Sequence, residues 1–205
     1  MKLPLALVLA IASSACRGSS VVVEDPAPTP VHPSRIVLAP KDEPGPPLEV
    51  TGQVFAPDGV TPAPGVTVYA YQTGVDGLYA HEPDAPPRIR GWMTTDGDGR
   101  FAFRTIRPGS YPGRTVPAHI HFQMWGGGWP VQYSEDINFA DDDLLTERER
   151  ERSKKLGRFG PIVTVEKDEQ GVLRATHDLC LKPKADELED NIQHGVRDEP
   201  RKAGR

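Results

Sequence analysis

Turn-forming residues divide the middle of the chain into short segments, and this spacing limits the folds open to it. Within the segments, apolar and polar residues alternate with a period of two, the pattern of a half-buried β-strand. The clearest segments are Leu48–Phe55, Val66–Tyr71, Arg100–Ile106 and Pro117–Met124. Several short strands, separated by Gly, Pro and Asp turns and without a long amphipathic helix, predict an all-β fold, an antiparallel β-sandwich.

Two later segments complete the expected architecture. Residues 144–156 contain strong helix formers and the alternating charges of Glu147–Arg152, which predict one short exposed helical excursion with a solvated charged face. Beyond it, Ile162–Glu166 and Val172–Leu179 flank residues 167–171, which predicts a hairpin.

The first residues have the order of a secretory signal peptide. In residues 1–15, one lysine precedes a short apolar run and then small residues, and the run is too short to span a bilayer. Cys16 follows Ser-Ser-Ala as in the cleavage box of a bacterial lipoprotein, although Ser13 stands where such boxes carry an aliphatic residue. The alternative is ordinary secretion with Cys16 incidental. The sequence predicts an exported protein, anchored to a membrane through a lipid at Cys16, on the periplasmic or cell-surface side.

Composition then divides the rest of the chain. Eight of the 22 prolines lie between Asp25 and Leu48, so residues 16–47 are predicted to be the lipid-anchor cysteine and a semi-rigid spacer. Residues 183–205 mix charges with few apolar residues and are predicted to be a disordered tail, which contains His194. Residues 48–182 remain as one folded domain of ordinary size.

Charge and cysteine content exclude two classes of protein. With 24 Lys and Arg against 29 Asp and Glu, the net charge of −5 leaves no basic surplus for phosphates, which excludes a nucleic-acid partner. Two cysteines do not make a disulfide scaffold. Cys180, within a predicted strand, is interpreted as a small buried apolar residue instead of a nucleophile.

His119 and His121 are the pair that most suggests chemistry. Residues two apart on a strand share one face, so both imidazoles can converge on one metal ion, although two exposed surface histidines are as common. Tyr79 and Tyr111 lie on loops, and Tyr111 precedes His119 by eight residues on a proline-constrained loop that can fold back over the strand. Either tyrosine alone could be a core or turn residue. Together, two phenolates and two imidazoles form a hard, anionic set that suits iron(III).

The same region contains an ordered series of motifs. They are Leu-Glu-Val-Thr-Gly-Gln-Val at 48–54, Pro-Gly-Val-Thr-Val at 64–68, Asp-Gly-Leu-Tyr at 76–79, Arg-Gly at 90–91, Thr-Thr-Asp-Gly-Asp-Gly-Arg-Phe-Ala-Phe at 94–103, Thr-Ile-Arg-Pro-Gly-Ser-Tyr-Pro at 105–112 and Pro-Ala-His-Ile-His-Phe at 117–122. In this order they resemble the intradiol ring-cleavage dioxygenases, the family of protocatechuate 3,4-dioxygenase and catechol 1,2-dioxygenase. The resemblance runs from about Leu48 to Lys182.

The resemblance implies a non-haem Fe(III) centre held by Tyr79, Tyr111, His119 and His121, with water or hydroxide completing the shell. It also implies a catechol as substrate, bound through both oxygens, and dioxygen as co-substrate. In the family, the tyrosine that matches Tyr111 leaves the metal and helps to take up a substrate proton. Cleavage between the two hydroxylated carbons then gives a muconate-type diacid.

Around the substrate, this sequence departs from the family pattern. Three residues before the first metal-binding histidine, the family places an arginine near the reacting ring, whereas this chain has Val116. Arg114 is close by and is our candidate for a substitute. Gly113 follows Tyr-Pro, and the family's Gln-x-Tyr-Phe stretch is altered to Asp-Ile-Asn-Phe at 136–139. The metal ligands are therefore better supported than the residues around the substrate.

The remaining candidates have structural explanations. His81 is interpreted as an exposed loop residue and His177 as a structural residue of a late strand, while Trp92, Trp125 and Trp129 suit either an aromatic pocket or core packing. The rival hypothesis for the whole chain is a non-catalytic, transthyretin-like β-sandwich binding module on the cell surface.

Overall fold

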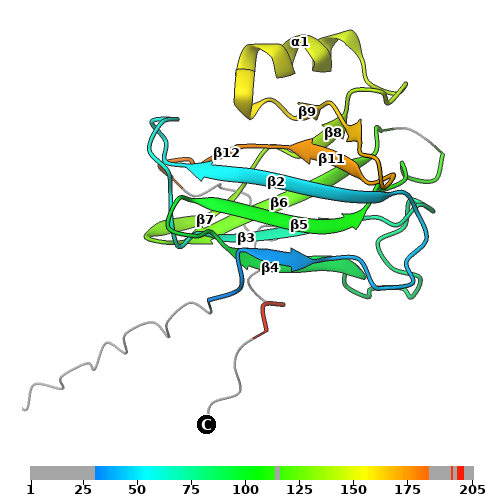
Figure 1. The fold of residues 1–205 in the computed structure, drawn as a ribbon, viewed down its shortest axis with the longest axis horizontal. Coiled ribbons are helices and arrows are strands. Elements are labelled where there is room, and N and C mark those ends of the chain that lie inside the picture. Colours follow the sequence, from blue (N-terminus) through cyan, green and yellow to red (C-terminus); the bar gives the residue numbers. More distant parts are fainter. Residues whose placement is uncertain (1–30, 114–115, 185–194, 196–197, 201–205) are drawn as a thin grey trace, which may run out of the picture.

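The computed structural model describes residues 31–113, 116–184, 195 and 198–200. Within them, two β-sheets pack face to face, which confirms the predicted sandwich (Figure 1). The first sheet contains, in spatial order, β1 (Arg35–Val37), β5 (Arg100–Ile106), β2 (Pro47–Phe55), β11 (Leu173–Thr176) and β10 (Glu166–Lys167), with β12 (Leu179–Cys180) also on β2. The second contains β4 (Ile89–Thr94), β3 (Thr67–Gln72), β6 (His119–Gly126), β8 (Ile137–Phe139) and β9 (Ile162–Val163), with β7 (Trp129–Tyr133) also on β6.

The core lies between the two sheets and is built from alternate residues of their strands. On β6, Ile120, Phe122 and Met124 are fully buried. The ring of Phe122 lies 6.2 Å from that of Phe101 and 6.1 Å from that of Phe103, both on β5. Because these rings interdigitate across the sandwich, they hold β6 and β5 in a defined register relative to each other.

Strand direction differs in part from the antiparallel expectation. The pairs β1–β5, β2–β11, β2–β12 and β8–β9 are parallel, and the long central pairs β2–β5 and β3–β6 are antiparallel. The predicted late hairpin is shorter than expected, with two residue pairs between β10 and β11. Its first half is divided, because Ile162–Val163 pairs with β8 in the second sheet before the chain crosses to the first.

The sandwich begins earlier than residue 48. Strand β1 lies within the predicted spacer and pairs with β5, and Leu38 is 5% exposed in the core. In the apolar run at 36–38, Leu38 is buried and Ile36 packs against the core, whereas Val37 is exposed. The predicted signal peptide, Cys16 and the spacer up to residue 30 lie outside the described residues.

The described residues of the predicted tail contact the second sheet. The indole N–H of Trp92 donates to the carbonyl oxygen of Gly195 (2.8 Å), and the Gly195 N–H donates to Gln123 Oε1 (3.1 Å). Glu199 is 8% exposed, with its carboxylate 2.7 Å from His32 Nε2. These residues are therefore ordered against the aromatic outer face of the sheet, unlike the expectation for the tail. Its remaining residues from 185 on, His194 included, lie outside the described part.

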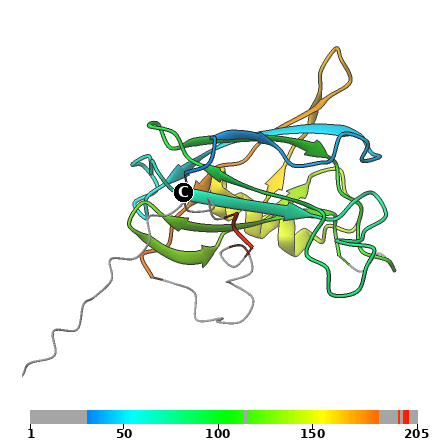
Figure 2. The ribbon, with the colours of Figure 1, turned by 90° about the horizontal axis from the view of Figure 1, so that it is seen from below.

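The predicted helical excursion is helix α1 (Glu147–Leu156), which ends in a short 3₁₀ turn, η1 (Gly157–Phe159). Thr146 and Glu149 form a capping box at its start, which satisfies two backbone N–H groups. Figure 1 shows the helix at one edge of the sandwich, next to β8 and β9, and in the view from below it lies behind the strands (Figure 2). In the described part of the chain, neither helical segment has the length and apolarity needed to cross a membrane.

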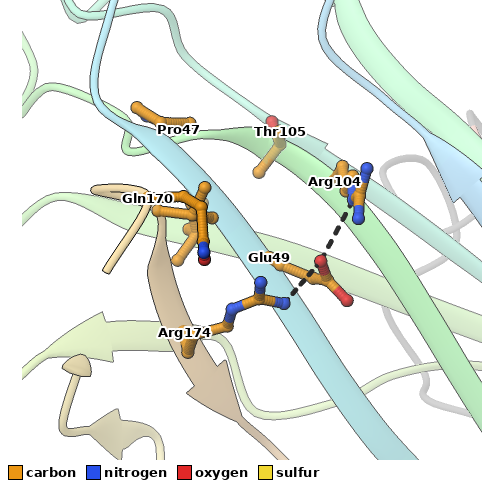
Figure 3. Close-up of a pocket in the computed structure, with 8 residues that line it drawn as sticks. Pro47, Glu49, Arg104, Thr105, Gln170 and Arg174 are labelled. Atoms are coloured by element: carbon orange, nitrogen blue, oxygen red, sulfur yellow. Dashed lines mark hydrogen bonds and ion pairs between the residues drawn. The ribbon is translucent and has the colours of Figure 1, made fainter. Parts of the chain in front are cut away.

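A row of paired charges crosses the outer face of the first sheet (Figure 3). Glu49 on β2 is 7% exposed and accepts from Arg104 on β5 (3.0 Å) and Arg174 on β11 (2.7 Å). The strand register places these three residues opposite one another. They line a groove of about 430 Å³. Because each arginine already faces a carboxylate, we assign this row to sheet stability.

His177 gives the fold a predicted dependence on pH. Its ring is 2% exposed between β11 and β12, packs on Phe122 and has Nε2 3.2 Å from the Glu135 carbonyl oxygen. Burial lowers the pKa of His177 in the folded protein. Below a pH of about 6.5, the His177 imidazole therefore takes up a proton in the unfolded chain but stays neutral in the folded one. We predict that this residue lowers the free energy of unfolding by up to about 1.4 kcal/mol per pH unit as the pH falls.

Urea unfolding of the metal-free protein between pH 7.5 and 5 measures this effect. His177→Gln should flatten the acid loss, because a glutamine at this position takes up no proton. Equal acid losses in the wild type and His177→Gln would contradict the prediction.

Candidate metal centre

Strand β6 presents two histidines on the outer face of the second sheet. Ile120 and Phe122 point into the core, so His119 and His121 point away from it. Their Nε2 atoms lie 3.0 Å apart. The predicted convergence of the two imidazoles is therefore present in the structure.

The two tyrosines come from two loops that pack against each other. The Thr73 hydroxyl donates to the Gly109 carbonyl oxygen (2.8 Å), and the Gly109 N–H donates to the Gly74 carbonyl oxygen (2.9 Å). Gly77, at φ +75°, lies so close to the next loop that an added Cβ would collide with the Ser110 carbonyl oxygen. This backbone contact brings the hydroxyls of Tyr79 and Tyr111 to 2.6 Å.

The four side chains form a closed ring of atoms that could each donate a lone pair to a metal ion, which we call the donor ring. Around the ring, Tyr79 Oη lies 2.6 Å from Tyr111 Oη, which lies 3.1 Å from His119 Nε2. His119 Nε2 is 3.0 Å from His121 Nε2, which is 2.8 Å from Tyr79 Oη. All four residues predicted as metal ligands thus meet at one point, from one strand and two loops.

The outer ring nitrogens determine the state of both imidazoles. His119 Nδ1 lies 2.7 Å from the Pro117 carbonyl oxygen, and His121 Nδ1 lies 3.0 Å from Asp136 Oδ1. Both partners can only accept, so each Nδ1 carries the proton and donates it. Each Nε2 then presents a lone pair to the centre of the ring, which is the state in which histidine binds a metal.

Counting protons shows why this ring suits a cation. The two neutral phenols supply one proton each, whereas the ring contains four contacts. In any arrangement, therefore, two of the four contacts bring two lone pairs together with no proton between them. A cation at the centre would relieve both. In the described part of the chain, His, Cys, Asp and Glu alone form no such cluster.

Burial determines the protonation states of Tyr79 and His119 in the metal-free protein. Burial, followed by the hydrogen bond to Tyr111, raises the pKa of Tyr79 well above its usual value, so Tyr79 is a phenol unless a cation stabilises its phenolate. Burial lowers the pKa of His119, which keeps that imidazole neutral and available as a ligand.

Arg88 and Glu43, which the sequence did not single out, hold the Tyr79 loop in place. Arg88 donates to the Leu78 carbonyl oxygen (2.6 Å) and to Glu43 (2.8 Å). Although burial opposes it, hydrogen bonds from His81, the Leu78 N–H and Arg88 lower the pKa of Asp76 to about 2. The exposed His81 therefore supports the loop from outside. Glu43 and Arg88 are 45 residues apart, and no local pattern connects them.

Aromatic rings lie behind the histidines on the same face of the sheet. Tyr71 stacks on His121 with ring centroids 4.7 Å apart, Tyr69 lies 5.3 Å from Tyr71, and Trp92 lies 4.9 Å from Tyr69. Trp92 and Trp125 belong to this cluster, and Trp129 packs against the main core. The three tryptophans therefore have packing roles. In this cluster, Tyr71 is the ring that stacks directly on His121 of the donor ring.

The substrate side of the centre is described in part. Val116 is 36% exposed. Arg114, the candidate substitute for the family's arginine, lies outside the described residues. Asp136, one of the altered positions, contacts His121 directly.

Comparisons with known proteins agree with this geometry. The dioxygenase family model matches residues 24–183. The protocatechuate 3,4-dioxygenase beta chain of Burkholderia cepacia is 31% identical over 138 residues, which cover 58% of each chain. Catechol 1,2-dioxygenase 1 of Acinetobacter lwoffii is 32% identical over 109 residues, which cover 43% of this chain and 34% of that protein. The dioxygenase domain of a carbohydrate-binding fusion protein from Streptomyces sp. SirexAA-E superimposes with a TM-score of 0.55 at 28% identity, covering 78% of this chain and 94% of that one.

The chain belongs to the intradiol dioxygenase family. The family match includes β1, which the expected domain boundary at residue 48 had left out, and all four residues of the donor ring. The chain spans 58% and 34% of the lengths of these two relatives.

The contact between the two loops predicts a strong effect at Gly77. Gly77→Ala places a side chain at φ +75° and against the Ser110 carbonyl oxygen, so we expect it to lower the free energy of unfolding by about 2–5 kcal/mol. Gly65→Ala is the matched control, because Gly65 has φ +72° and no atom within 4 Å of an added Cβ. It should cost only about 1–2 kcal/mol. Urea unfolding measures both, and equal losses would refute a tight contact between the loops.

Proposed function

We propose that this protein is a non-haem iron(III) enzyme that cleaves a catechol-type aromatic diol with dioxygen, between its hydroxylated carbons, to a muconate-type diacid. The closed ring of Tyr79, Tyr111, His119 and His121 carries the proposal. These four residues would hold Fe(III), because two phenolates and two neutral imidazoles form a hard, anionic set. When bound, the iron supplies the activation of the catechol toward dioxygen.

The two tyrosines have different roles in this proposal. The loop of Tyr79 is anchored through Arg88, whereas Tyr111 is followed by exposed Pro112 and by Gly113 at φ +89°. Tyr111 is therefore the phenol suited to move away and to take up, at its Oη, a proton that the catechol loses on binding. We assign Arg114, three residues beyond, to the reacting ring in place of the arginine that Val116 replaces.

The donor ring favours an enzyme over a non-catalytic binding module of the transthyretin-like kind. Without a cation, two of the four contacts in the ring oppose lone pairs, and burial of the ring increases that penalty. A module without a metal gains nothing from such an arrangement, whereas a metal enzyme requires it.

Iron content and colour test the proposal. The protein purified after expression with iron should be burgundy, because tyrosinate-to-iron(III) charge transfer absorbs visible light. Tyr79→Phe should lose the colour and most of the iron, whereas Tyr69→Phe, a buried tyrosine on the same sheet outside the donor ring, should keep both. Oxygen uptake over a panel of catechols then measures turnover, which Tyr111→Phe should lower by about 10²-fold or more and Arg114→Ala should also lower.

Three outcomes would count against this function. A colourless, iron-free wild type would refute the proposal that the protein is an iron enzyme. Bound iron without oxygen uptake on any catechol would refute catalytic turnover and leave a vestigial iron site. Equal iron contents for Tyr79→Phe and Tyr69→Phe would show that the metal lies elsewhere.

We also propose that the protein is exported and held at a membrane by a lipid on Cys16. The signal-peptide order of residues 1–15 and the Ser-Ser-Ala-Cys box support this proposal. Cys16→Ser should release the protein from the membrane fraction. Cys180→Ser is the control, because Cys180 is a partly buried thiol of the folded domain and its loss should leave membrane partitioning unchanged. Unchanged partitioning of Cys16→Ser would exclude the lipid anchor.

A further inference from the structure

The two histidines of the donor ring have unequal partners. His119 Nδ1 donates to a neutral backbone carbonyl, that of Pro117 (2.7 Å). His121 Nδ1 donates to a carboxylate, Asp136 Oδ1 (3.0 Å). The Asp136 side chain is 34% exposed, and among the residues that the structure describes its one hydrogen-bonding partner is His121. The Asp136 carboxylate therefore interacts with the His121 imidazole and makes no other side-chain hydrogen bond within the described residues.

The backbone holds Asp136 in place from both sides. The next residues form β8, where Ile137 pairs with Ile120 and Asn138 pairs with His119 itself. On the other side, the Glu135 carbonyl oxygen lies 3.2 Å from Nε2 of the buried His177. These contacts keep the Asp136 carboxylate beside His121 without using its side chain.

The neighbouring carboxylate points elsewhere. Both Glu135 side-chain oxygens are bound by Arg152 of helix α1, at 2.6 and 2.7 Å. Of two adjacent acidic residues, one thus faces the donor ring and the other faces the helix.

We propose that Asp136 is a positioning residue that makes His121 the stronger of the two imidazole ligands. Its carboxylate fixes the Nδ1–H tautomer and the orientation of the His121 ring, and its charge increases the electron density at Nε2. His119, with a neutral partner, lacks the second effect. This inference rests on the proposed iron(III) site, where a more electron-rich ligand set favours the ferric ion.

Competition with a chelator for Fe(III) and the wavelength of the tyrosinate–iron absorption together test this role. We expect Asp136→Ala to weaken iron(III) binding by about 10- to 100-fold. Asp136→Asn keeps an acceptor oxygen but no charge, so its loss of affinity should be smaller. Its absorption should move to longer wavelength, since a less electron-rich His121 leaves the iron a better electron acceptor. Glu135→Gln removes the adjacent charge and should change neither measurement.

Thermal unfolding of the metal-free variants separates positioning from folding, and the Asp136 variants should unfold within a few degrees of the wild type. Iron binding by Asp136→Ala within about threefold of the wild type, or a loss that Glu135→Gln reproduces, overturns the role of Asp136 while the iron site stands. A wild type that binds no iron overturns the proposed function, and this inference with it.

Discussion

The packing of every second residue of β6 into the core between the sheets is the constraint on which the candidate centre depends. Ile120, Phe122 and Met124 are fully buried in the core, and the residues between them face outward. A slip of one residue would expose three large apolar side chains and place His119 and His121 in the core, at a cost of several kcal/mol. The same interaction that folds the sandwich therefore places both imidazoles on the outer face, where Pro117 and Asp136 hold them with their Nε2 atoms 3.0 Å apart.

The tyrosines depend on a different interaction, the contact between two loop backbones. Gly77 and Gly109 have no room for a side chain, and the Thr73 hydroxyl bridges from one loop to the other. Backbone contacts of this kind are short and directional. They therefore fix the positions of the two phenols more precisely than contacts between long side chains would. Strand register supplies half of the donor ring and loop contact supplies the other half.

Elements with a strong period of two were predictable from sequence, and those that depend on distant partners were not. Arg100–Ile106 has the same bounds in sequence and structure, with Phe101 and Phe103 buried in the core while Arg100 and Arg104 are exposed. Strand β1 has three residues between prolines, too few to show a period, and forms because β5 offers a free edge. The contacts of Gly195 and Glu199 depend on Trp92 and His32, more than a hundred residues away. The four donor residues were found through residue type and motif order, whereas the position of Asp136 follows from the pairing of β8 with β6.

Function and stability make opposite demands on the donor ring. In the metal-free protein, four buried or half-buried polar atoms share two protons, and His119 and Tyr79 are both held in their neutral forms by burial. Local rules of hydrogen bonding are broken there and nowhere else along β6, which is where a functional site is expected. A cation would remove the conflict, so its binding free energy would add to the stability of the sandwich. The pairing of β6 with its neighbours and the contacts of the Tyr79 loop keep the ring closed in the metal-free protein.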